Sequence, residues 1–306
     1  MSSILTNANA LSALQALQMT QQEMAQTQNQ VSTGLAVASA ADNAAYWSIG
    51  TQLNSDSGVV TAANSALTQS QSVLDTASSA ISSIVTTIKA IQTALTEATN
   101  PGADIGNIQT TLTQLGNQLS DAVNGASFNG LNVTDGSQSA AALNFVSGFN
   151  ATATGGTINT INFTTLALIS TTSGGQAATP PLAAGSGILE GGTGAAAGGG
   201  QDLLTLGTFV TDAATANTAL AGVATVLNSV TNYAATIGAT QDRMTAASTF
   251  NTALSTDYAN GVSGLVDANM NTASTRLQAL QTQEQLGIQS LSIANQNAQL
   301  ILKLFP

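Results

Sequence analysis

The stretch LTQSQSVLDTASSAISSIVTTIKAIQTAL, residues 67–95, carries the pattern that decides the fold. Large aliphatic residues recur there in steps of seven, at Leu67, Leu74, Ile81, Ile88 and Leu95. A second set lies between them at the spacing of a heptad repeat, at Ala77, Ile84 and Ile91. Such a repeat is typical of a helix of coiled-coil character. At 1.5 Å per residue this stretch alone predicts a helix of roughly 40 Å.

The chain after this stretch predicts a second helix and a tight turn. Asn100-Pro101-Gly102 ends the first helix, because proline cannot continue it and glycine permits the turn. We expect Asp104 to cap the second helix, whose apolar face is Ile105, Ile108, Leu112, Leu115 and Leu119. The two helices predict an αα-hairpin. Phe128-Asn129-Gly130-Leu131-Asn132-Val133 then predicts a β-hairpin with an Asn-Gly turn.

Helical periodicity returns in the C-terminal half and is also present at both ends of the chain. One long amphipathic helix is outlined by Phe209, Ala213, Ala216, Leu220, Val223, Leu227, Val230, Ala234 and Ile237. The N-terminal helix is outlined by Ile4, Ala8, Leu11, Leu14, Leu17, Met24 and Val31. The last helix is outlined by Leu277, Leu280, Ile288, Leu291, Ile301, Leu302 and Phe305.

The segment between these helical parts differs from them in composition. Half of the 28 glycines lie in residues 136–200, together with both Pro180 and Pro181. Glycine and proline break helices, so this insert predicts loops and short strands, with strand candidates at Ile161–Phe163 and Leu166–Ile169. The predicted fold class is therefore mainly α. Long helices from both chain ends pack together, with a short β-hairpin and a small central β/loop insert.

The composition excludes most kinds of chemistry. Lys and Arg number 4 against 15 Asp and Glu, which gives a formal net charge of −11 and too few cations to bind a row of phosphates. There is no Cys and no His, so thiol nucleophiles, the usual zinc ligands and the commonest general base are absent from the sequence. We expect no enzyme activity, cofactor or metal, and no nucleic-acid partner. No apolar stretch approaches the roughly 20 residues that span a bilayer, so we expect no membrane insertion.

The two terminal helices are unusually poor in charge. Glu23 is the only charged residue in 1–41, and Glu284 is the only one in 277–302. A solvated helix normally carries Glu/Lys pairs, whereas charges are costly and amides can pair in an interface between subunits. We therefore predict that the apolar residues of both terminal helices form an assembly interface. Frayed, Gln-rich tails are the alternative interpretation.

Short motifs at both ends, in the same order, are similar to those of the bacterial flagellins. At the N-terminal end they are Ile4-Leu5-Thr6-Asn7, Ala10-Leu11-Ser12-Ala13, Ser32-Thr33-Gly34-Leu35 and Ser39-Ala40-Ala41-Asp42. At the C-terminal end they are Ile237-Gly238-Ala239-Thr240-Gln241-Asp242-Arg243, Asp267-Ala268-Asn269-Met270, Ala294-Asn295-Gln296 and Leu304-Phe305. The resemblance covers residues 1–135 and 205–306.

The resemblance implies three regions. Residues 1–41 with 270–306 are expected to form the inner filament core, and 42–135 with 201–269 a helical rod with a hairpin near 128–134. Residues 136–200 are expected to form a small outer surface insert. It further implies a connector at Gly34, Asp42 and Asn43, and a rod core whose residues are Leu67, Leu74, Ile81, Ile88, Leu95, Leu112, Leu220, Leu227 and Arg243.

The resemblance also implies a function and partners. A flagellin is an extracellular subunit that polymerises with itself into the flagellar filament for swimming. It is exported without a cleaved signal peptide, and its partners are an export chaperone, the filament cap and the hook-junction proteins. Two alternatives remain: a hook–filament junction protein, which tends to have Pro-Ser-Asp-Asp where this chain has Ala40-Ala41-Asp42-Asn43, and a Gly/Thr-rich secreted surface adhesin. Many flagellins carry arginine on the surface that host receptors read, whereas residues 86–100 of this chain offer only Lys89, so the resemblance does not extend to such recognition.

Overall fold

The computed structural model describes residues 7–137, 142–152, 155–169, 187–190 and 202–304. It is mainly α-helical, as predicted, with four long helices and two antiparallel hairpins among the described residues. The chain divides into two compact units, residues 1–58 with 255–306 and residues 59–254, and each is described by itself. These bounds are not those of the three regions expected above, and that scheme stays a prediction.

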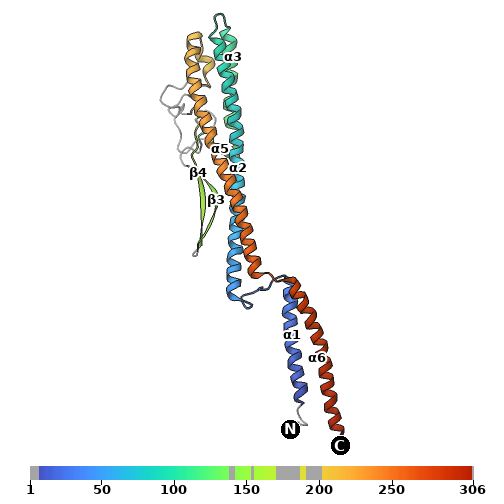
Figure 1. The fold of residues 1–306 in the computed structure, drawn as a ribbon. Helices are drawn as coiled ribbons and strands as arrows, with labels where there is room; N and C mark the ends of the chain where they lie inside the picture. Colours follow the sequence, from blue (N-terminus) through green and yellow to red (C-terminus); the bar gives the residue numbers. More distant parts are fainter. Residues whose placement is uncertain (1–6, 138–141, 153–154, 170–186, 191–201, 305–306) are drawn as a thin grey trace. The chain divides into compact units, whose positions relative to one another are not determined.

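The core of the 59–254 unit is built by three helices, α2 (Ala44–Ala98), α3 (Ile105–Gly125) and α5 (Ala213–Val266). Figure 1 shows α2 and α5 running side by side through this unit. The heptad prediction is confirmed, since each of its residues is at most 1% exposed: Leu67, Leu74, Ile81, Ile88 and Leu95. Their partners on the other helices include Leu112 of α3 and Val223 and Val230 of α5.

The helix ends follow local capping rules. Asp104 caps α3 as predicted, because its Oδ1 accepts a hydrogen bond from the Asn107 amide at 3.2 Å. The periodicity predicted that the long helix of the C-terminal half begins near Phe209, and this start is wrong. A short helix, α4 (Leu206–Phe209), comes first, and α5 begins at Ala213, where Asp212 accepts the Thr215 amide at 2.8 Å. These bonds from Thr215 lower the pKa of Asp212.

The first hairpin matches its prediction. It pairs β1 (Ser127–Phe128) with β2 (Leu131–Asn132). Asn129 and Gly130 form the turn with φ of 51° and 78°, the left-handed values that a two-residue hairpin turn requires.

A second hairpin pairs β3 (Leu143–Thr152) with β4 (Gly155–Phe163), with a register shift between Val146 and Gly148. The strand expected at Ile161–Phe163 is thus the end of β4. The strand expected at Leu166–Ile169 is wrong, since those residues form no ladder. Leu168 and Ile169 are instead buried in the core as irregular backbone.

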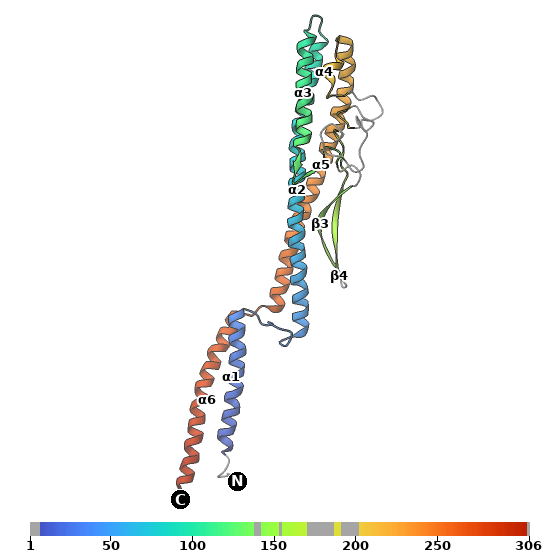
Figure 2. The ribbon, with the colours of Figure 1, turned by 180° about the vertical axis from the view of Figure 1, so that it is seen from behind.

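Aromatic and amide contacts fix the second hairpin to α5, and Figures 1 and 2 show it beside that helix. The ring centroid of Phe163 lies 6.0 Å from that of Phe145 and 6.0 Å from that of Tyr233. The Tyr233 hydroxyl donates to the Val133 carbonyl at 2.6 Å, and burial raises the pKa of Tyr233. Asn251 donates from Nδ2 to the Ser147 carbonyl of β3 at 2.9 Å.

Candidate assembly surface

The two terminal helices, α1 (Ala8–Thr33) and α6 (Met270–Leu304), form an antiparallel pair. Asn7 caps α1 and also donates from Nδ2 to the Ala294 carbonyl at 2.9 Å. At the other end of the pair the Ala268 amide donates to the Gly34 carbonyl at 2.8 Å. The pairing thus runs along α1 from its start, beside Ala294, to its end, near Ala268, and α6 continues beyond Ala294 (Figure 1).

The pair buries few side chains within one subunit. Among the described residues the buried ones are Thr27 on α1 and Ala273 and Leu280 on α6. Close approach is also seen at Gly287, where an added Cβ would lie 3.3 Å from Leu17 Cδ1. So thin a contact contributes little of the hydrophobic free energy that normally stabilises a helix pair.

Polar contacts across the pair are exposed. Arg276 Nη2 lies 3.2 Å from Glu23 Oε2, and the two side chains are 58% and 52% exposed. Gln21 donates to Glu284 at 3.2 Å, also in an exposed place. Exposed ion pairs of this kind contribute at most about 1 kcal/mol. These contacts therefore add little to the stability of the pair.

Large apolar side chains point away from the pair into solvent. They are 40–60% exposed, at Leu11, Leu14, Met19, Met270, Leu286, Ile288 and Ile293. A folded protein seldom leaves a series of large apolar residues on charge-poor helices without a partner. Such a series of exposed apolar residues is typical of a surface that contacts a partner.

The predicted interface residues divide into four groups. Leu11, Leu14 and Ile288 are exposed, whereas Leu280 packs inside the pair of its own subunit. The half-buried ones are Leu17, Met24, Val31, Leu277 and Leu291. Ile4 and Phe305 lie outside the described residues. Ile301 and Leu302 belong to α6, but their side chains are not described.

The sequence reasoning missed Met19, Leu286 and Ile293, which are 59–60% exposed. They lie off the single apolar stripe that was used to choose interface residues. The available signal was that both terminal helices carry large apolar residues on more than one face, which a two-helix pair cannot bury.

The connector between α1 and α2 is shaped by three predicted residues. Gly34 ends α1 with a left-handed φ of 75°. Asp42 Oδ2 accepts the Ser39 amide at 2.9 Å, which closes the turn before α2. Asn43 Oδ1 accepts the Ala45 and Tyr46 amides, both at 3.1 Å, and so caps α2. Within the described residues no three Asp or Glu gather as metal ligands would.

One predicted core residue of the rod is wrong. Arg243 is exposed, and the adjacent Met244 is the residue that is fully buried in α5. Arg243 was taken from a motif rather than from the apolar pattern, and a charged guanidinium is rarely buried without a partner. Leu220 and Leu227 are half-buried at the margin of the core. Gln241, in the same motif, donates to Asp75 Oδ1 on α2 at 2.7 Å.

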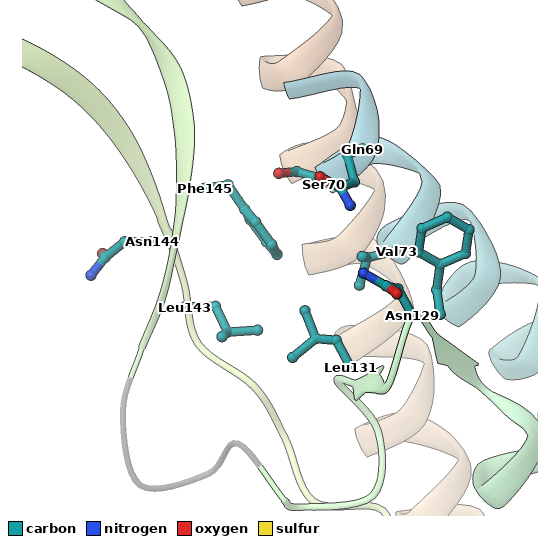
Figure 3. A pocket seen from close by; sticks show the side chains of 9 residues that line it. Gln69, Ser70, Val73, Asn129, Leu131, Leu143, Asn144 and Phe145 are labelled. Carbon is teal, nitrogen blue, oxygen red and sulfur yellow. The ribbon is translucent and has the colours of Figure 1, made fainter. Parts of the chain in front are cut away.

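A pocket of about 260 Å³ opens between α2, the first hairpin and β3 (Figure 3). Its lining residues are Gln69, Ser70, Val73, Phe128, Asn129, Leu131, Leu143, Asn144 and Phe145. The lining residues are apolar, amide or hydroxyl side chains, and none of them carries a charge. In the described part of the chain no helix is long and apolar enough to span a membrane.

Comparison with known proteins gives two family matches. The bacterial flagellin N-terminal helical region matches residues 4–139, and the bacterial flagellin C-terminal helical region matches residues 220–305. Flagellin C of Rhizobium meliloti (strain 1021) is 36% identical over an alignment of 291 residues that covers 89% of this chain and 89% of the relative. A flagellin of Brucella melitensis biotype 1 is 35% identical over 274 residues, 89% of this chain and 87% of the relative.

Other relatives match over a shorter segment. Flagellin A of Rhizobium meliloti is 43% identical over 132 residues, which are 43% of this chain and 33% of that protein. The match therefore spans about a third of the length of that relative.

Proposed function

The chain belongs to the bacterial flagellin family, and we propose that it is a structural subunit that polymerises through α1 and α6 into the flagellar filament for swimming motility. The observation that supports this most is the series of exposed apolar residues on two helices almost free of charge. When copies associate in one direction, such surfaces become buried and produce a helical polymer.

Family membership supports the remaining parts of the proposal. The filament is extracellular, and the subunit leaves the cell without a cleaved signal peptide. Its partners are further copies of itself, an export chaperone, the filament cap and the hook-junction proteins. Residues 1–41 with 270–306 form the filament core, 42–135 with 201–269 the rod, and 136–200 the outer insert. Flagellins are structural proteins, and we propose no enzyme activity.

Assembly of the purified chain tests the proposal directly. We expect the full-length protein, seeded with sheared native filaments, to form filaments that negative-stain electron microscopy shows. The seeds alone and the unseeded protein are the controls. A chain that stays monomeric at every concentration, with and without seeds, would contradict a role as filament subunit.

The thin packing between α1 and α6 leads to a second prediction. We expect a protease to cleave the monomer preferentially before residue 40 and after residue 270, because these helices open at little cost in free energy. In filaments the same sites should be protected, since neighbouring subunits cover them. Mass spectrometry of the fragments locates the cuts. If monomer and filament resist the protease equally at both ends of the chain, assembly does not protect the terminal helices, and the prediction is wrong.

A further inference from the structure

A group of exposed aromatic and aliphatic residues lies outside the terminal helices, in the first turns of α2. Tyr46, Trp47 and Ile49 are 47%, 41% and 49% exposed. We call these three residues the α2 patch. Trp47 is the only tryptophan of the chain. Large aromatic residues bury much apolar area, so nearly half exposure of three neighbours is unusual for a surface without a partner.

Among the described residues, the packing of α5 against α2 ends before it reaches the α2 patch. The α2 residues that face α5 follow a three-and-four spacing, at Gly50, Leu53 and Ser57. A Cβ at Gly50 would lie 2.6 Å from Val266 Cγ2, and Val266 is the last residue of α5. Tyr46 and Trp47 precede Gly50 by four and three residues, so they lie beyond the end of this helix-to-helix packing.

The chemistry around the patch fits a second copy of this chain. No charged residue lies between Asp42 and Asp56, so the charge-poor part of the sequence continues from α1 into the start of α2. Most exposed side chains of α1 and α6, in the same compact unit, are apolar or carry amides or hydroxyls, and the exposed charges among their described side chains are those of the Glu23–Arg276 pair. Apolar residues would cover the rings, and amides would pair with the indole N–H and the phenol hydroxyl.

We propose that the α2 patch is a second self-association surface, which receives the terminal helices of a neighbouring copy in the filament. The inference rests on the proposed function and adds a contact to it. Among the described residues neither the Tyr46 hydroxyl nor the Trp47 indole N–H has a hydrogen-bond partner within the chain. Both polar groups are therefore free to bond across the contact.

The single tryptophan makes the contact measurable without a label. Acrylamide quenching of Trp47 fluorescence is compared between the monomer and filaments of the unmodified chain. We expect the quenching constant to fall severalfold in filaments, because the indole becomes buried. Filaments in which Trp47 is quenched as readily as in the monomer would overturn the proposal. Failure to form any filament would instead count against the proposed function.

Substitution provides the second arm of the test. Trp47→Ser and Tyr46→Ser should each raise the critical concentration for assembly by roughly tenfold or more, since buried Trp and Tyr dominate interfaces. Trp47→Phe, which keeps an apolar ring, is the matched control and should have a smaller effect. Circular dichroism of the monomers confirms that each variant is folded.

Two results of the substitution arm would overturn the proposal. One is assembly of Trp47→Ser at the concentration that the unmodified chain needs. The other is protection of Trp47 only when an export chaperone is added, which would assign the patch to that protein instead.

Discussion

Leu14→Asp should abolish filament formation while the rest of the subunit stays folded. Leu14 is 40% exposed on α1 and is not among the buried core residues of the described chain. In the proposed interface the new carboxylate would be buried without a cation, which costs several kcal/mol. A loss of about 3 kcal/mol raises the critical concentration more than a hundredfold. Sedimentation and electron microscopy of seeded samples measure the effect.

The matched control is Leu14→Met, which keeps the volume and the apolar character of the side chain. It should assemble near the concentration that the unmodified chain needs. Thermal unfolding of both monomers should be unchanged, because the side chain lies on the surface of its own subunit. If Leu14→Asp forms normal filaments at the usual concentration, α1 does not present this face to a neighbour.

The long helices could be predicted from the sequence because one physical rule governs them. Leu67 and Leu95 occupy the same heptad position and are both fully buried. A helix with apolar residues at heptad spacing buries them by packing that face against neighbouring helices. The caps at Asp104 and Asn43 are equally local, since a side-chain oxygen satisfies a nearby amide wherever the chain goes. Arg243 is wrong because family motifs mix core and surface residues.

The second hairpin was largely beyond prediction. Strand β3 does not alternate strictly, because a register shift interrupts its ladder between Val146 and Gly148. Its position depends on tertiary contacts, such as the Asn251 amide on Ser147, that no local pattern reveals. Leu166–Ile169 was predicted as a strand from its apolar run alone. A short apolar run is equally consistent with a buried loop and with a strand of a β-sheet.

The candidate interface was predicted at the level of helices rather than of faces. The scarcity of charge pointed to α1 and α6, but both helices carry apolar residues on more than one face. Which of these faces is left exposed depends on how α1 and α6 pack against each other. Leu280 faces that partner, whereas Leu286, six residues later, is 59% exposed. A stripe drawn on one helix cannot distinguish the contact within a subunit from the contact between subunits.

Phe163→Ala should destabilise the 59–254 unit by about 3–5 kcal/mol, the usual cost of emptying a large aromatic site in a core. Phe163 is 1% exposed, and its ring lies between those of Phe145 and Tyr233, so it joins β4 to α5. Its loss removes apolar contacts from both neighbours and leaves a cavity. Urea unfolding followed by circular dichroism measures the change in the free energy of unfolding.

The chain provides a matched control for this substitution. Phe250→Ala deletes the same atoms from a residue that is 64% exposed on α5, so it should change the free energy of unfolding by about 0.5 kcal/mol or less. Equal losses from the two variants would mean that the second hairpin is not part of the core. Because Phe163 is remote in sequence from α1 and α6, its variant should still form filaments wherever it remains folded. Assembly would then depend on the terminal helices even in a weakened rod.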